Sequence, residues 1–136
     1  MRDQTGNATL EFIGVSVFLA IPLLYAMLAM GQLQSAIDGV NGAAQMAARA
    51  YATASTDTLG RYAAVRSAGI AGRNHGLLIT TNQVTISCGT PNCMHSGAVV
   101  RVAITSPLRI TLGPFAKTWM LKASQTTMID QYRATP

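Results

Sequence analysis

Two cysteines and a nearby histidine carry the most obvious chemistry in this chain. Cys88 and Cys93 are separated by Gly-Thr-Pro-Asn, a turn composition that can bring the two thiols together. Outside the cytoplasm such a pair is expected to be oxidised. A metal site would add His95 and His75, but the cysteine spacing is at the wide end for zinc and no second Cys or His pair supports it. The pattern favours a disulfide, with a metal site as the alternative.

The acidic residues are too few and too scattered to suggest catalysis. Beyond the apolar N-terminal part the chain has only Asp38, Asp57 and Asp130, which fall in separate predicted elements. There is no nucleophile elbow, no phosphate-binding loop and no His-Glu metal motif. We therefore expect a protein that is not an enzyme and that uses no cofactor.

One further acidic residue has an unusual position. Glu11 stands five residues after Gly6 and directly before the uncharged run of residues 12–30. A carboxylate at the edge of a membrane segment is costly unless something uses it. Glu11 is therefore either a functional group or, in a plain membrane anchor, an interfacial charge.

The uncharged run is long enough to cross a membrane. Residues 12–30 in a helix span about 28 Å, close to the thickness of the hydrocarbon layer. The run is longer than the apolar part of a secretory signal, and no Ala-x-Ala cleavage site follows it. Pro22 predicts a kink that a lipid-embedded helix tolerates. Arg2 weakly favours an N-terminus in the cytoplasm and a C-terminal part outside.

The helical pattern continues beyond this segment. Apolar residues recur at three- and four-residue spacing as far as Tyr51, and no proline interrupts residues 23–90, so we expect one helix over residues 9–51. Small residues occupy every fourth position of a second face, namely Ser35, Gly39, Ala43 and Ala47. Such a face lets another helix approach closely. That helix belongs either to a neighbouring subunit or to the protein's own domain.

The rest of the chain predicts a small α+β domain. Cap residues from Ser55 onward start a second helix over residues 58–71, with Tyr62 and Ile70 in the core. Alternation with period two then predicts a three-stranded antiparallel sheet, covered on its apolar face by a helix. The strand patterns fall at residues 84–88, 98–105 and 121–129.

Prolines separate the last two strand patterns. Pro107 and the pair Gly113 and Pro114 predict an irregular connection between them. Several apolar residues fall in this connection, namely Leu108, Ile110, Leu112, Phe115 and Trp119. We expect them either at the membrane surface or a partner, because Trp favours interfaces, or in the small core.

Composition points to membrane attachment. Hydrophobic residues make up 49% and charged residues 11%, whereas about a quarter is usual for charged residues in free globular proteins. The net charge is +5, without any run of Lys or Arg, which favours a solvated positive surface. The alternative is contact with a polyanion through Arg61, Arg66 and Arg73, on or near the second helix.

Over nearly its full length the chain resembles the TadE-like minor pilins or pseudopilins of the tight-adherence (Flp, type IVb) pilus system. The stretch from Gly6 to Phe12 is similar to the processing and membrane region of that family. Residues 84–102 resemble its cysteine hairpin and following strand, and residues 123–133 resemble its closing strand. The short, weakly basic leader and the polar Asn7 depart from the type IV pattern.

The resemblance implies a division of the chain into four parts. Residues 1–6 would be a prepilin leader and residues 7–30 a transmembrane helix. Residues 31–54 would be its emergent continuation, and residues 55–136 an extracytoplasmic pilin-like domain. A prepilin peptidase would cut between Gly6 and Asn7, and the new amine on Asn7 would pair with Glu11 of an adjacent subunit.

The resemblance also implies a function and a set of partners. The protein would initiate, prime or tip a pilus at the bacterial cell membrane, together with other pilin subunits, an assembly platform and membrane lipid. Two alternatives remain at this point. One is a DNA-binding pseudopilin for DNA uptake, and the other is a plain single-pass envelope protein.

Overall fold

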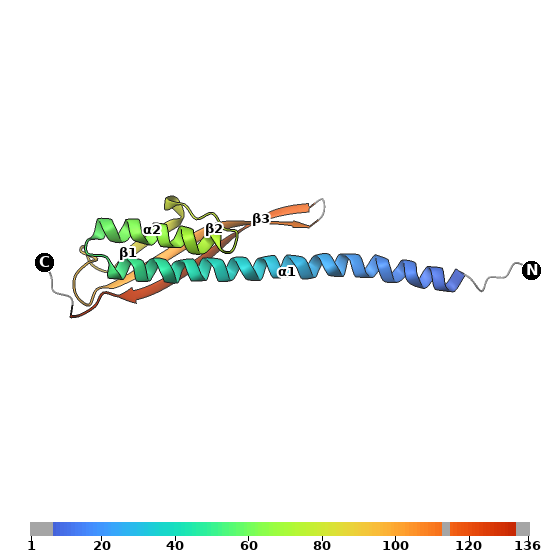
Figure 1. Ribbon diagram of the computed structural model, residues 1–136, viewed down its shortest axis with the longest axis horizontal. Helices are drawn as coiled ribbons and strands as arrows, with labels where there is room; N and C mark the ends of the chain where they lie inside the picture. The colour runs from blue at the N-terminus through green and yellow to red at the C-terminus, as the bar shows by residue number, and fades with distance from the viewer. Residues whose placement is uncertain (1–6, 113–114, 133–136) are drawn as a thin grey trace, which may run out of the picture.

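The protein consists of one very long helix, a second helix packed along it, and a small sheet (Figure 1). The computed structural model describes residues 7–112 and 115–132. Its elements are α1 (Asn7–Thr53), α2 (Asp57–Arg73), the short 3-10 helix η1 (Thr81–Gln83), β1 (Val84–Cys88), β2 (Val99–Leu112) and β3 (Phe115–Met128). The strands form one antiparallel sheet in the order β1-β2-β3. The expected α+β class is confirmed.

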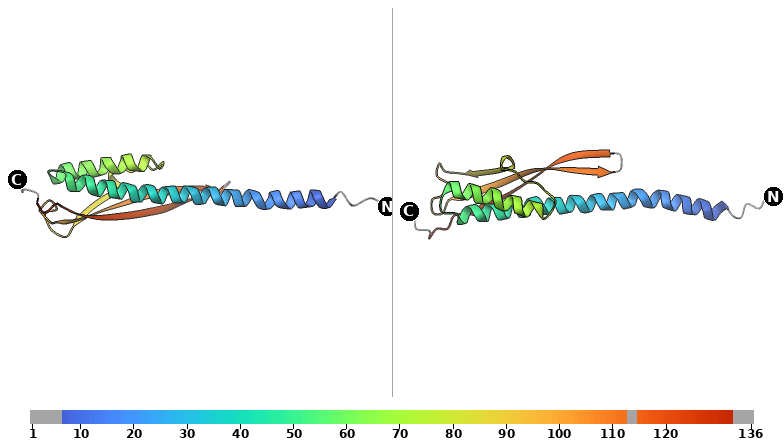
Figure 2. Two further views of the ribbon diagram at one scale, coloured as in Figure 1. Left: turned by 60° about the horizontal axis from the view of Figure 1, so that its bottom comes forward. Right: turned by 45° about the horizontal axis from the view of Figure 1, so that its top comes forward.

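Helix α1 joins the apolar N-terminal part to the domain without a break. Its 47 residues continue through Pro22 and give a length of about 70 Å. The N-terminal half projects beyond the domain, and the C-terminal half runs between α2 on one side and the sheet on the other (Figure 2, left). One helix therefore serves both as the projecting rod and as the central element of the core.

The core forms where α1 meets the sheet. Every second residue of β2 faces inward, so that Val100, Val102 and Ile104 are fully buried. They belong to one apolar cluster with Val40 and Tyr51, which lie on the predicted apolar face of α1. The three- and four-residue spacing read from the sequence thus marks a face of α1 that is buried in the core of the domain.

The small-residue face of α1 packs within the protein's own domain. Gly39, Ala43 and Ala47 are buried, and α2 buries its own small residues Gly60, Ala64, Ala68 and Gly72. The segment that follows α2 also comes close to this face, because a Cβ added at Gly39 would lie 2.6 Å from the Cβ of His75. Of the two alternatives for this face, contact with the domain is the one that occurs along residues 39–47.

The prediction that Tyr62 and Ile70 lie in the core is wrong. Their exposed fractions are 64% and 52%, and Leu59 on the same face is also exposed. The buried face of α2 lies on the opposite side of the helix and consists of glycine and alanine. Since α1 presents small side chains as well, the two backbones come close and the larger side chains of α2 are left facing outward.

The predicted connection between the last two strands is also wrong. β2 and β3 pair continuously from Val99 with Met128 to Leu112 with Phe115, so residues 106–120, apart from the undescribed residues 113–114, are strand. Pro107 lies within β2, opposite Met120. β1 pairs with β2 only as far as Ile104, so the rest of β2 has an open edge. An edge strand tolerates a proline, because no strand lies on its open side to need the missing N–H.

Candidate functional site

The N-terminal half of α1 is an uncovered apolar surface. Its large side chains are more than half exposed throughout, as in Phe12 at 73% and Phe18 at 78%. Among the described residues, α1 is the one helix long and apolar enough to cross a membrane. Water is a poor solvent for such a surface. Shielding this surface from water therefore requires lipid or helices of other subunits around it.

Glu11 is the single charged residue of this described N-terminal stretch. It is exposed on α1, four residues after Asn7, at which α1 begins. Residues four apart lie on the same side of a helix, so Glu11 and the start of α1 face the same way. The predicted processing residue Gly6 lies outside the described residues. The helix thus presents one carboxylate next to its first turn and only uncharged side chains from there to Met30.

The two cysteines form a disulfide. Cys88 ends β1, Cys93 lies in the connection to β2, and their Cα atoms are 5.6 Å apart. The bridge closes a short loop, which corresponds to a stabilisation of about 2 kcal/mol in the chain-entropy view. It holds the connection close to the end of β1, and so helps to fix the start of β2.

The residues of the alternative metal site are not gathered together. Nδ1 of His95 lies 2.7 Å from the carbonyl oxygen of Asn92, and Nδ1 of His75 lies 3.4 Å from the hydroxyl of Ser35. Within residues 7–112 and 115–132, no three side chains of the His, Cys, Asp or Glu types are placed to hold an ion. The arrangement therefore favours the disulfide over the metal site.

A polar cluster that the sequence did not reveal joins the end of α1 to the start of α2. The hydroxyl of Tyr51 donates to Asp57 at 2.5 Å, and Nε of Arg61 donates to the other carboxylate oxygen at 2.8 Å. Burial and the bond to Asp57 raise the pKa of Tyr51 to about 12. The bonds from Tyr51 and then Arg61 lower the pKa of Asp57. The cluster fixes the turn between the two helices.

The fold should lose stability in acid as Asp57 takes up a proton. A carboxyl with a folded-state pKa below its ordinary 3.8 stabilises the fold above that value and loses this contribution as the pH falls through the lowered pKa. Asp57→Asn should be less stable than wild type at neutral pH. Between about pH 4 and pH 2 it should lose less stability than wild type does. Thermal unfolding of the full chain in detergent measures this. Asp38→Asn, at an exposed acid of α1, is the control, and equal slopes for wild type and Asp57→Asn would contradict the prediction.

The three arginines proposed for polyanion contact are all exposed on α2. Arg61 is paired with Asp57. Arg66 and Arg73 lie on the outward face of α2, and a nitrogen of Arg66 is 3.4 Å from the hydroxyl of Tyr62. Other exposed cations occur on the outer face of the sheet, namely Arg101, Arg109 and Lys122. Because α2 and the sheet lie on opposite sides of α1 (Figure 2), the positive charge is divided between two faces.

Comparison with known proteins adds no relative. No protein-family model, no curated protein and no solved structure matches this chain. The function must therefore be argued from the exposed apolar helix, the single carboxylate at its start and the disulfide-bridged domain that it carries.

Proposed function

We propose that this protein is a minor pilin or pseudopilin, anchored in the bacterial membrane by α1 and assembled with other subunits through the same helix. The observation that carries the proposal is the apolar N-terminal half of α1, which the domain leaves uncovered and which holds one carboxylate, Glu11, near its start. An anchor alone needs the apolar surface. The carboxylate at its edge needs a further reason.

Assembly supplies that reason. In the membrane, lipid covers residues 12–30, and in a filament the same surface packs against helices of neighbouring subunits. Glu11 then enters apolar surroundings, where an unpaired charge is strongly disfavoured. Cleavage after Gly6 creates a positively charged amine on Asn7, which pairs with Glu11 of the adjacent subunit. Because only one axial offset brings the two charges together, the pair selects that offset.

The domain is consistent with a minor role rather than with the bulk of a filament. It contains α2, three strands and a disulfide, all built on the C-terminal half of α1. Such a domain presents specific surfaces to other subunits or to an assembly platform. In this proposal the protein initiates, primes or tips the pilus, and its part in catalysis is limited to being the substrate of a prepilin peptidase.

The intact mass of the chain extracted from the membranes of its host tests the proposal. We expect a chain that begins at Asn7. Gly6→Asp should keep residues 1–6, whereas Gly14→Ala, a change at a glycine with open space around it, should be cut normally. A wild-type chain that keeps residues up to Gly6 would reduce Glu11 to an interfacial charge and leave a plain anchor as the better explanation.

A further inference from the structure

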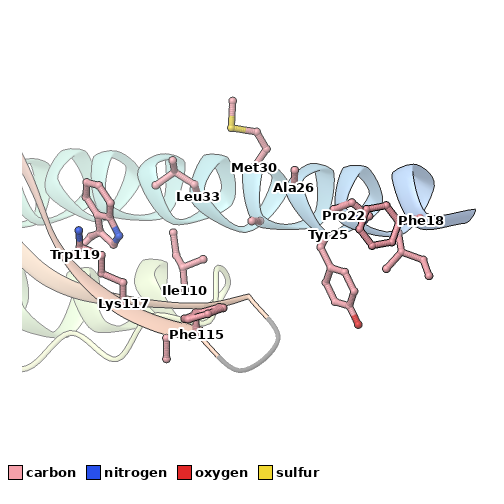
Figure 3. A pocket seen from close by; sticks show the side chains of 13 residues that line it. Phe18, Pro22, Tyr25, Ala26, Met30, Leu33, Ile110, Phe115, Lys117 and Trp119 are labelled. Carbon is pink, nitrogen blue, oxygen red and sulfur yellow. The ribbon is translucent and has the colours of Figure 1, made fainter. Parts of the chain in front are cut away.

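The ends of β2 and β3 form an arm that reaches back along α1 toward its N-terminal half (Figure 1). We define the hairpin arm as residues 105–112 and 115–122, beyond the last residue that pairs with β1. A cleft of about 1150 Å³ separates the arm from α1 (Figure 3). Its main lining residues are Phe18, Pro22 and Tyr25 of α1 and Ile110, Phe115 and Trp119 of the arm.

The cleft is apolar because of the strand register. Leu108 pairs with Trp119 and Ile110 pairs with Lys117, so these four residues share the face of the arm that looks toward α1. The same face is fully buried farther along β2, at Val102 and Ile104, where β1 completes the sheet. On the arm it stays open, and Trp119 is 52% exposed and Phe115 77% exposed. The core face of the sheet therefore continues outward as an unfilled apolar wall.

The opposite wall belongs to the segment that spans the membrane. Phe18, Pro22 and Tyr25 all lie within the uncharged residues 12–30. In the bilayer this wall is surrounded by hydrocarbon, so the material available to fill the cleft is an acyl chain. The volume exceeds the roughly 300–1,000 Å³ of ordinary small-molecule sites, which suits a long flexible chain.

Lys117, the one cation among the described residues that line the cleft, lies at the end where a lipid headgroup would be. Figure 3 shows Lys117 and Trp119 at the end near Leu33, away from Phe18. Leu33 lies three residues after Met30, the last residue of the uncharged run, so this end lies at the membrane boundary. The ammonium of Lys117 is 5.0 Å from the centre of the Trp119 ring. Trp with a basic residue is typical of the membrane–water boundary, and a Lys there attracts anionic lipid.

We propose that this cleft binds a phospholipid of the leaflet next to the domain. An acyl chain lies between the arm and α1, and an anionic phosphate headgroup lies beside Lys117. The inference rests on the membrane insertion included in the proposed function and does not depend on filament assembly. The arm thereby becomes a second membrane contact, in addition to α1.

Trp119 allows a direct test, because it is the only tryptophan of the chain. The full chain is placed in mixed vesicles of phosphatidylcholine and phosphatidylglycerol in which only one of the two lipids carries brominated acyl chains, and Trp119 fluorescence is recorded. We expect blue-shifted emission and strong quenching by lipids brominated near the headgroup. Brominated phosphatidylglycerol should be enriched around Trp119 by about fivefold over its bulk share, the effect of about 1 kcal/mol from one basic residue.

Two variants separate the site from general membrane charge. Lys117→Met should abolish the enrichment of phosphatidylglycerol, whereas Lys122→Met, a change on the other face of the same strand, should leave it intact. Emission typical of water with quenching by acrylamide alone would overturn the proposal. So would quenching that disappears as the ratio of protein to lipid rises, because a second copy of the chain would then fill the cleft. Loss of Gly6 processing would affect the proposed function but not this result.

Discussion

Glu11→Ala is expected to leave the protein in the membrane but to remove it almost completely from filaments. The substitution makes α1 more apolar, so insertion of residues 12–30 is unaffected. In the proposed filament it would also leave the amine on Asn7 of the neighbouring subunit without a partner in apolar surroundings. Removing one member of a buried ion pair costs roughly 3–5 kcal/mol, which corresponds to association weakened more than a hundredfold.

The measurement compares sheared filaments with the membrane fraction by immunoblot in the native host. Asp38→Ala is the matched control, since Asp38 is also an exposed acid on α1 but lies on the half of the helix that carries the domain. It should be incorporated like wild type. Glu11→Ala found in filaments at the wild-type level would show that the carboxylate has no role in assembly, even if the chain is processed after Gly6.

Two glycines of α1, three residues apart, should respond differently to alanine. A Cβ at Gly39 would lie 2.6 Å from the Cβ of His75, an atom fixed to the backbone, whereas a Cβ at Gly42 meets nothing within 4 Å. Both variants gain about 1 kcal/mol of helix propensity. In Gly39→Ala, overpacking also lowers the free energy of unfolding by about 1–3 kcal/mol. Gly42→Ala should therefore be more stable than wild type, and Gly39→Ala should lie below Gly42→Ala by that cost.

Thermal unfolding of the full chain in detergent, followed by near-ultraviolet circular dichroism, compares the two variants. This signal arises from aromatic side chains in fixed surroundings, such as the buried Tyr51, and from the disulfide, rather than from the helix content of the N-terminal half of α1. Equal shifts for Gly39→Ala and Gly42→Ala would mean that α2 and the following residues can move away from α1 at low cost. Packing of small residues would then not be what positions α2.

Sequence periodicity was sufficient where one face of an element is apolar and the other is not. The face of α1 that contains Val40 and Tyr51 and the inward residues of β2 follow their periods directly. The disulfide was accessible for a similar reason, since a turn composition between Cys88 and Cys93 constrains the chain locally. These features depend on neighbours in sequence.

Features that depend on distant partners were not accessible in the same way. On α2, Tyr62 and Ile70 suggest a core face, but the glycines and alanines on the other side are buried because α1 also offers small residues there. Pro107 suggests the end of a strand, but β1 stops at Ile104 and leaves β2 with an edge that tolerates it. In both cases the identity of the neighbour decides the outcome, and one sequence does not supply it.

The cleft illustrates the same limit. The sequence predicts for Trp119 and Phe115 either contact with the membrane surface or a partner, or burial in the small core. Their position beside the membrane segment follows only from the length and register of the hairpin. The structure shows that these residues and the N-terminal half of α1 line one cleft, which their sequence positions alone do not indicate.

Because α1 is unbroken, it also fixes the rotational orientation of the domain about the helix axis. No described interruption separates Glu11 from Tyr51, so the direction in which Glu11 points fixes the direction in which the arginine-bearing side of α2 points, tens of ångströms away. One residue inserted between Gly31 and Gln34 would advance the domain by only about 1.5 Å but would turn it by about 100°. A neighbour that docks on Glu11 thereby also chooses which side of the domain it meets.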